Sequence, residues 1–333
     1  MIRKSICTLL CVCCLLSAVS CGLEDPETVE SFYLMDTLVT VTLYAPPSQA
    51  DPIIARCRTM MEELDALWSR TREGSDISRL NFSQNGIAQA DPRTREIIEL
   101  AIDVFSKTDG AFDVTVLPAI SYWEMCEEHQ ILPNAIAMKD CLMRVGANRL
   151  SVTAGGAISK PAGVKVDLGG IGKGAAISKL IEYLKTTDIP GGVVSFGSNV
   201  AVFGEKRDGS DYRIALRDPF KEGEYAGVLT LSADDVLSVS GDYERYYTIN
   251  GEKYHHILDP KTGYPAQSGL SSVAVVCSDG ALADALSTAL FVMGEDAAQE
   301  LYSAKVFDFE AIFIATDGTL TQTDGMKTIF TQE

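Results

Sequence analysis

Positive charge is scarce in this sequence. Its 333 residues include 28 lysines and arginines against 46 aspartates and glutamates, which gives a formal net charge of −18 at pH 7. Such an acidic surface excludes nucleic-acid binding, because it repels the phosphate backbone. It also excludes adhesion to anionic lipid through basic patches. The sequence has no low-complexity tract and no internal repeat, and 46% of its residues are hydrophobic, so we expect a globular chain.

The N-terminal hydrophobic segment has the form of an export signal. The apolar run at residues 6–18 is too short to cross a membrane comfortably. It follows a basic start at Arg3 and Lys4 and ends in the small residues of SAVSCG. This pattern predicts a lipoprotein signal peptide over residues 1–20, with Cys21 as the lipidated first residue of the mature protein. An ordinary secretory signal with an incidental Cys21 is the alternative.

The predicted lipid determines where the protein is expected to work. Because basic patches are excluded, the lipid at Cys21 would be what holds the chain to a membrane. Residues 21–30 then form a short acidic tether, and residues 31–330 form one domain. We therefore expect a membrane-anchored lipoprotein that faces the periplasm or the cell exterior.

Cysteine is scarcer than its count of nine suggests. Four cysteines lie within the predicted signal and Cys21 takes the lipid, which leaves Cys57, Cys126, Cys141 and Cys277. Their spacing matches no metal site. Cys57 falls on an apolar helix face and Cys277 in a valine-rich strand, so both are expected in the core. Cys126 and Cys141 could pair, but a fold held together by disulfides is not expected in so long a chain.

The hydrophobic pattern changes from helical to strand-like along the chain. Residues 31–44 alternate like a strand pair or one long strand, and later apolar residues recur at helical spacing. The expected helices are 52–68, 92–107, 133–145, 175–185, 281–293 and 296–303. The expected strands are 150–153, 164–168, 192–203, 212–217, 228–231, 236–240, 245–249, 270–277, 310–315 and 320–323. Because helices group early and strands late, the pattern favours an α+β fold over a regular βαβ array.

A glycine-rich run at residues 166–174, VDLGGIGKG, is expected to join a strand to a helix. Glycines let the backbone approach a ligand closely, and a helix N-terminus offers free N–H groups to an anion. Lys173 adds a mobile positive charge. The run is neither a Walker A loop nor the dinucleotide fingerprint. Phosphate contact and a purely structural turn both remain open for this run.

A second polar group lies within residues 254–290. His256 precedes an Asp-Pro-x-x-Gly turn, and a later helix carries Asp284, Ser287 and Thr288. Asp284 and Thr288 are four residues apart, so they share one helix face with Ser287 beside them. One carboxylate with neutral oxygens suits Mg²⁺ and a substrate phosphate. The alternatives are a structural histidine and an aspartate that only favours the helix dipole.

Seven short blocks together resemble one known family. VDLGGIGKGAA, SVSGDYERYY, HHILDPKTGYPA and DGALADALSTAL occur in the order seen in the ApbE family of FAD:protein FMN transferases, and MDT, SDISRLN and GAFDVT add three more. The resemblance covers residues 31 to about 330. It implies a single catalytic domain with the family's α+β fold, in which a tunnelling-fold-like antiparallel sheet and helix core carries a smaller helical and β subdomain.

The resemblance implies a phosphoryl transfer. A threonine hydroxyl of a recipient protein, a redox or electron-transport subunit, attacks the FMN-side phosphorus of FAD, and AMP leaves. Lys173 would hold the pyrophosphate, and His256 would orient or deprotonate the threonine or contact the phosphate, so His256 and Asp284 are the expected catalytic residues. The implied FAD contacts are Met35, Thr71, Ala111, Phe112, Asp113, Asp167, Lys173 and His256. The implied Mg²⁺ ligands are the Gly170 backbone carbonyl, Asp284, Ser287 and Thr288.

The chain departs from the family pattern at two of these places. Asp36 stands where the family usually has glycine, and glycine there suggests close approach of the backbone to the flavin. Thr71 stands where the family often has an aromatic residue that stacks on the ligand. Stacking is then expected to be weaker, or to come from Trp68 or Tyr243.

Two other functions could be served by the same candidate residues. An FAD pyrophosphatase would replace the threonine by water and would need the same metal and phosphate groups. A lipoprotein that stores or delivers FAD would need neither Asp284 nor Thr288, so the presence of both disfavours it.

Overall fold

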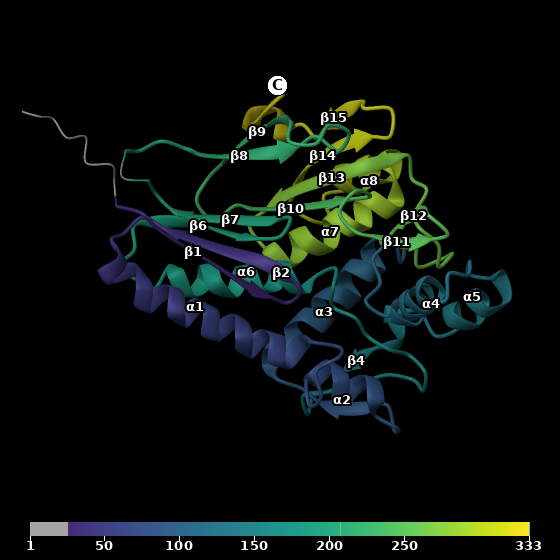
Figure 1. The fold of residues 1–333 in the computed structure, drawn as a ribbon. Coiled ribbons are helices and arrows are strands. Elements are labelled where there is room, and N and C mark those ends of the chain that lie inside the picture. Colours follow the sequence, from purple (N-terminus) through teal and green to yellow (C-terminus); the bar gives the residue numbers. More distant parts are fainter. Residues whose placement is uncertain (1–25, 207, 333) are drawn as a thin grey trace, which may run out of the picture.

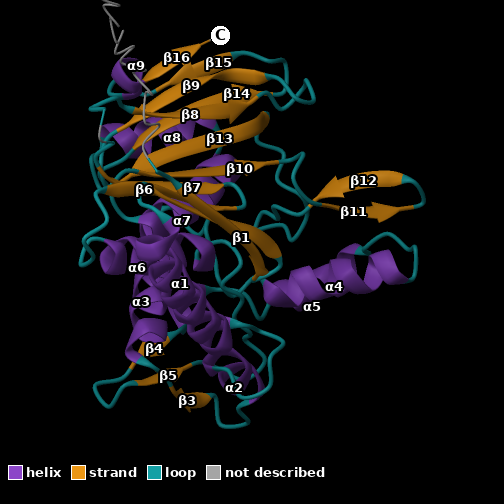
Figure 2. Ribbon diagram, turned by 60° about the vertical axis from the view of Figure 1, so that its left-hand side comes forward, coloured by secondary structure: helices purple, strands orange, loops and turns teal. Residues whose placement is uncertain are grey.

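The computed structural model describes residues 26–206 and 208–332 (Figure 1). The predicted signal peptide and Cys21 lie outside these residues. Among the helices that are described, none is both long and apolar enough to span a membrane. The chain has the predicted α+β fold, in which a large antiparallel sheet is covered by helices on one face and by a smaller sheet on the other (Figures 1 and 2).

The large sheet has eight strands, each antiparallel to its neighbours. Across the sheet they follow in the order β1 (Thr28–Leu34), β2 (Thr37–Leu43), β6 (Gly191–Phe196), β7 (Asn199–Gly204), β10 (Val236–Gly241), β13 (Leu270–Cys277), β14 (Glu310–Ala315) and β15 (Leu320–Gln322). Every residue of β13 is buried, because this strand lies between β10 and β14 and is covered on both faces.

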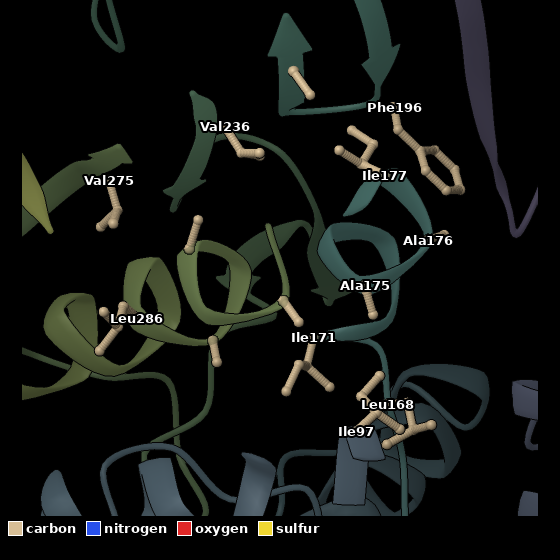
Figure 3. Close-up of a cluster of buried hydrophobic side chains, with 14 of the residues drawn as sticks. Ile97, Leu168, Ile171, Ala175, Ala176, Ile177, Phe196, Val236, Val275 and Leu286 are labelled. Carbon is tan, nitrogen blue, oxygen red and sulfur yellow. The ribbon is translucent and has the colours of Figure 1, made fainter. Parts of the chain in front are cut away.

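Helices pack against one face of the large sheet and enclose the main core. They are α1 (Pro47–Trp68), α3 (Pro92–Lys107), α6 (Gly172–Leu184), α7 (Gly280–Met293) and α8 (Glu295–Ser303). Figure 3 shows Ile171 between α6 and α7, with Ile97 of α3 below it and Val236 of β10 above. The main core therefore lies directly behind the glycine-rich run and fixes where α6 begins.

A three-stranded sheet covers the opposite face. Its order is β16 (Phe330–Gln332), β9 (Tyr225–Leu231) and β8 (Tyr212–Arg217), with the short helix α9 (Met326–Ile329) beside it. The side chains of β10 alternate between the two faces. Val236 belongs to the main core, whereas Leu237 belongs to a second cluster with Leu229 and Ile312. Ser238 and Ser240 therefore point toward the helices.

A smaller lobe projects from the body (Figure 2). It consists of α4 (Leu117–Glu128), α5 (Ala135–Leu142), β11 (Tyr246–Ile249) and β12 (Glu252–His255). Trp123 is its centre, with ring centroids 5.4 Å from Tyr247 and 5.3 Å from Tyr254. The Trp123 Nε1 donates a hydrogen bond to the Gly263 carbonyl at 2.8 Å. The lobe matches the expected smaller subdomain, and it joins segments far apart in the sequence.

Several expected elements have the predicted bounds, and one is wrong. The helix at 92–107 and the strands at 212–217, 270–277 and 310–315 are confirmed. Residues 164–168 are not a strand. The Asn81 side chain accepts from the Val166 N–H at 2.7 Å and donates to the Val166 carbonyl at 2.8 Å. Because a side chain occupies these backbone groups, no strand partner pairs with them.

Other differences come from turns and from short elements. The expected strand at 192–203 is the hairpin β6–β7, whose turn contains Gly197 at a φ of +65°. The expected strand at 150–153 is the shorter β4 (Ser151–Val152). The sequence pattern did not indicate α2 (Asp76–Phe82), β3 (Ile87–Gln89), β5 (Ala157–Ser159), the 3₁₀ turn Ala147–Arg149, α4, β12, β16 or α9. Cys57, Cys126, Cys141 and Cys277 are all buried and free, so Cys126 and Cys141 are not bonded to each other.

The contact between α6 and α7 depends on Gly174. A Cβ added there would lie 1.9 Å from the Gly280 carbonyl oxygen and 2.6 Å from the Asp284 Cβ. We expect Gly174→Ala to push the helices apart and to lower the free energy of unfolding by about 1–3 kcal/mol in denaturant titrations. Gly172→Ala is the matched control, because the nearest atom to a Cβ there is 3.7 Å away. Equal stabilities of the two variants would contradict this prediction.

Candidate active site

Asp284 is held at the place where α7 meets α6 and the large sheet. The Asp279 side chain begins α7 by accepting hydrogen bonds from the Ala281 and Leu282 N–H groups. Asp284 follows in the second turn and is only 6% exposed. Its Oδ2 accepts from the Gly174 N–H at 2.9 Å, and its Oδ1 lies 3.3 Å from the Asn199 Nδ2. A carboxylate on the buried side of α7 does more than complement a helix dipole.

Hydroxyl groups surround this carboxylate. The Ser240 Oγ is 2.8 Å from the Ser287 Oγ and 3.3 Å from the Thr288 Oγ1, and the Ser238 Oγ is 3.4 Å from the Asp284 Oδ1. The sequence prediction assigned Ser287 and Thr288 to the metal site and gave no role there to Ser238 or Ser240. Their spacing of two residues on one strand was the available signal, since it places both side chains on the same face.

Gly170 lies against the same group. A Cβ added there would be 3.6 Å from the Thr288 Oγ1 and 3.2 Å from the Phe112 ring. The donors gathered here are oxygens of one carboxylate, of hydroxyls and of a nearby backbone. Among the described residues there is no cluster of three or more histidines, cysteines, aspartates or glutamates, so the candidate site contains a single carboxylate. Oxygen donors of this kind are the ligands that Mg²⁺ takes together with water and substrate phosphates.

An orphaned oxygen supports the same interpretation. The Asn199 side chain is fully buried beside Asp284, and its Oδ1 has no hydrogen-bond partner among the described residues. A buried acceptor without a partner costs free energy, so bound water or a hydrated cation would stabilise it. The residues present therefore fit Mg²⁺.

The glycine-rich run is supported by Asp167. Its Oδ1 accepts from the Gly169 N–H at 2.7 Å, and its Oδ2 pairs with the Arg70 Nε at 3.0 Å. Arg70 also donates to the Glu124 Oε1 at 2.5 Å, so it joins the run to the lobe. The resemblance implied an FAD contact for Asp167, and its oxygens here hold the run in place. Arg70 was missed, because nothing in the sequence connects it with residue 167.

His256 is held by the segment before β11 and lies within reach of the Lys173 charge. Its Nδ1 is 3.0 Å from the Arg245 carbonyl oxygen. A carbonyl only accepts, so Nδ1 carries the proton and Nε2 of the neutral ring has a free lone pair. Burial lowers the pKa of His256 to about 4, with a contribution from the charges of Arg245 and Lys173. His256 is therefore neutral near pH 7 and able to accept a proton.

The polar residues near His256, which are Glu244, Lys173 and His255, differ in role. Burial raises the pKa of the Glu244 carboxyl, and the positive charge of Lys173 opposes this shift. Lys173 lies in the first turn of α6, where its Nζ donates to the Gly169 carbonyl at 3.3 Å. His255 is bound to the Ala266 carbonyl at 3.0 Å and packs edge-on against Phe291, so it is a structural residue.

The other expected FAD contacts fall on separate segments of the chain. Met35 and Asp36 form the turn between β1 and β2, at φ values of +46° and +57°. Aspartate tolerates this left-handed conformation better than most residues, which explains how it replaces glycine there. The charge of Asp36 acts on Asp65, so the turn lies near the end of α1. Burial is the largest effect on Asp65 and raises the pKa of its carboxyl, Arg72 lowers it and Asp36 raises it. Thr71, which is exposed, follows just after α1.

Ala111, Phe112 and Asp113 form a buried segment behind the glycine-rich run. The Asp113 Oδ1 accepts from the N–H and the hydroxyl of Thr115, at 2.7 and 2.6 Å. Its Oδ2 accepts from the Ala147 N–H at 3.2 Å, and burial raises its pKa. The side chain of Asp113 thus fixes the segment, and Phe112 is the member that reaches Gly170.

Arg70 should matter for the stability of the site. We expect Arg70→Ala to lower the free energy of unfolding by about 1–3 kcal/mol, because Asp167 and Glu124 each lose a charged partner. It should also weaken FAD binding severalfold, as measured by quenching of flavin fluorescence. Arg72→Ala is the matched control, since Arg72 is 56% exposed and pairs with Asp65 at 3.6 Å. An Arg70→Ala protein that matches this control would refute the role.

Comparison with known proteins places the chain among flavin transferases. The model of the ApbE family matches residues 35–313. The FAD:protein FMN transferase of Treponema pallidum (strain Nichols) is 28% identical over 85% of this chain and 84% of the relative. That of Haemophilus influenzae is 30% identical over 81% of this chain and 78% of the relative.

Solved structures agree with these relatives. The ApbE protein of Thermotoga maritima has a TM-score of 0.84 at 28% identity and covers 91% of this chain and 99% of its own. The flavin transferase ApbE of Vibrio cholerae, solved as a histidine-to-glycine variant, has a TM-score of 0.79 at 26% identity and covers 91% and 99%. With its motifs, its fold and these relatives in agreement, the chain belongs to the ApbE family.

Proposed function

We propose that this protein transfers the FMN moiety of FAD to a threonine hydroxyl of a recipient protein, in a Mg²⁺-dependent reaction that releases AMP. The relatives named FAD:protein FMN transferase support the reaction class. One observation carries the proposal for this chain. The group of Asp284, Ser287 and Thr288 meets the glycine-rich run, and the run continues into Lys173 beside a neutral His256.

Asp284, Ser287, Thr288 and the Gly170 carbonyl are the groups that would hold Mg²⁺. When bound, the ion would neutralise negative charge on the pyrophosphate of FAD. Lys173 adds a second positive charge at the start of α6. The chain thus offers two separate means of binding phosphate in a strongly acidic protein.

His256 is suited to handle the proton of the incoming hydroxyl. In the proposed step the threonine oxygen forms a bond to the FMN-side phosphorus, and the bond from that phosphorus to the bridging oxygen breaks. The bridging oxygen leaves with AMP, and the threonine proton passes to the Nε2 lone pair of His256. The lowered pKa makes the ring a weaker base than a free histidine, and it keeps the Nε2 lone pair available below pH 7 as well as above it.

The reaction can be tested directly. The protein is mixed with FAD, Mg²⁺ and candidate recipients that carry a threonine flavinylation motif, and a fluorescent recipient band on a denaturing gel is expected. AMP release without any recipient would favour an FAD pyrophosphatase. Intact FAD after long incubation would favour a binding protein and would contradict the proposal.

We also propose that Cys21 anchors the protein to a membrane as a lipoprotein that faces the periplasm or the cell exterior. The basic start, the short apolar run and the small residues before Cys21 support this. Cell fractionation of a Cys21→Ala variant tests it, because a variant that is still processed and still membrane-bound would be incompatible with lipidation at this residue.

A further inference from the structure

A groove opens at one end of the molecule between the small sheet and the hairpin of β14 and β15. Its volume is about 680 Å³, and its walls include Phe220, Lys221, Glu224, Tyr225, Ile314 and Leu320. Its wall residues belong mainly to the turn from β8 to β9 and to the hairpin of β14 and β15. These four strands lie together at the top of Figure 1. No group implicated in the proposed chemistry lines it.

The groove exposes aromatic surface. Phe220 is 50% exposed and Tyr225 is 55% exposed, although burying each ring would be favourable. Lys221 lies 3.3 Å from Glu224 and 3.8 Å from Asp218, so the charges at the rim are largely paired. Exposed aromatic side chains that line a groove beside paired charges are typical of a protein-binding surface.

Strand pairing places this groove at the same end of the large sheet as the active site. Gly241, the last residue of β10, pairs with Ser272 of β13. Leu270 of β13 in turn pairs with Ala315 of β14. A Cβ on Gly318, in the following turn, would touch Phe220 at 3.9 Å. The ends of β10, β13 and β14 therefore lead from the active-site serines to the groove.

Charged side chains also lie on the route from the groove to the active site. Arg217 ends β8 immediately before the groove. Its positive charge lowers the pKa of Tyr243 and of Glu244, against the larger raising effect of burial at both groups. The charge of Lys173 also lowers the pKa of Glu244 and of His256, against and together with burial respectively. The charges of Arg217 and Lys173 therefore both act on Glu244, which lies between the groove and the reacting centre along the chain.

We propose that this groove binds the recipient protein, as an extended segment that carries an apolar side chain near the acceptor threonine. The proposal rests on the transferase function above. Neighbouring strands are about 5 Å apart and packed sheets about 10 Å apart, so the groove is on the order of 10–20 Å from the reacting centre. An extended chain spans this distance in roughly four to six residues. The apolar side chain is therefore expected at a separation of roughly four to six residues from the acceptor threonine in the recipient's sequence.

The test is a double variant, Phe220→Ser with Tyr225→Ser, assayed with a recipient that the wild-type protein labels. We expect the KM for the recipient to rise about tenfold or more, while kcat and the affinity for FAD stay within about twofold. Phe82→Ser is the matched control, because Phe82 is also an exposed aromatic side chain, at 72%, but lies on α2. Thermal unfolding verifies that the variants are folded, and Tyr225→Phe should retain the wild-type KM.

The outcomes separate the two proposals. An unchanged recipient KM in the double variant, with labelling by the wild-type protein intact, would overturn the docking proposal alone. A wild-type protein that labels none of the recipients would overturn the transferase function, and the docking proposal with it. A rise in KM that Phe82→Ser shares would also count against the groove.

Discussion

Replacing Asp284 with asparagine should abolish flavin transfer while FAD still binds. Asparagine keeps the size of the side chain and can still accept from the Gly174 N–H, which the carboxylate meets at 2.9 Å. It removes the one negative charge of the predicted Mg²⁺ site. We expect the rate to fall by about 10³-fold or more, which corresponds to roughly 4 kcal/mol of transition-state stabilisation. Initial rates of recipient labelling measure the effect.

A second readout separates loss of the metal from loss of the fold. Mg²⁺ that binds only the folded state raises the midpoint of thermal unfolding, so the wild-type protein should respond to Mg²⁺ and Asp284→Asn should not. Asp76→Asn is the control, because Asp76 is equally buried at 3% exposure but binds Thr94 and the Asp91 N–H. It should cost stability and leave the kcat of the folded protein unchanged. Wild-type turnover in Asp284→Asn would refute the metal assignment.

Replacing His256 with glutamine should lower kcat by about 10²–10⁴-fold, the range typical for loss of a general base. Because burial lowers the pKa of His256 to about 4, the ring stays neutral well below the 6.5 of a free histidine. The rate of the wild-type protein should therefore hold from about pH 8 to pH 5 and fall only as the pH approaches 4. A decline centred near pH 6.5 would contradict this assignment.

The difference between the pKa of His256 in the folded chain and its pKa in the unfolded chain also affects stability. Between about pH 4 and 6.5 the unfolded chain binds a proton at His256 that the folded chain does not. The free energy of unfolding should therefore rise with pH over this interval and level off above it. Denaturant titrations of the wild-type protein and His256→Gln should diverge here, with the smaller slope in the variant. Parallel curves would show that His256 is not held neutral.

The fold was predictable where the chain is strongly patterned. The helix Pro92–Lys107 and the strand Leu270–Cys277 have continuous apolar periodicity, and both have the predicted bounds. Residues 164–168 look equally like a strand, but Asn81 occupies the backbone of Val166 from 85 residues away. A side-chain partner so distant in sequence leaves no local signal.

The candidate site was likewise predictable only where its residues are close together in the sequence. Asp284, Ser287 and Thr288 share one helix, so their spacing alone predicted that they would act together. Ser238, Ser240 and Asn199 reach the same place from two other strands, which only the tertiary structure reveals. Arg70 is a similar case, because its partners Asp167 and Glu124 lie on different segments.

The lobe around Trp123 links flavin binding to the stability of a distant part of the chain. Its hydrogen bond from Trp123 to Gly263 joins residues 140 positions apart. Arg70 needs the lobe residue Glu124 to hold Asp167 and the glycine-rich run. On the proposed function, FAD that binds only while the lobe is closed would protect the lobe against local opening, because a ligand stabilises the state that it binds.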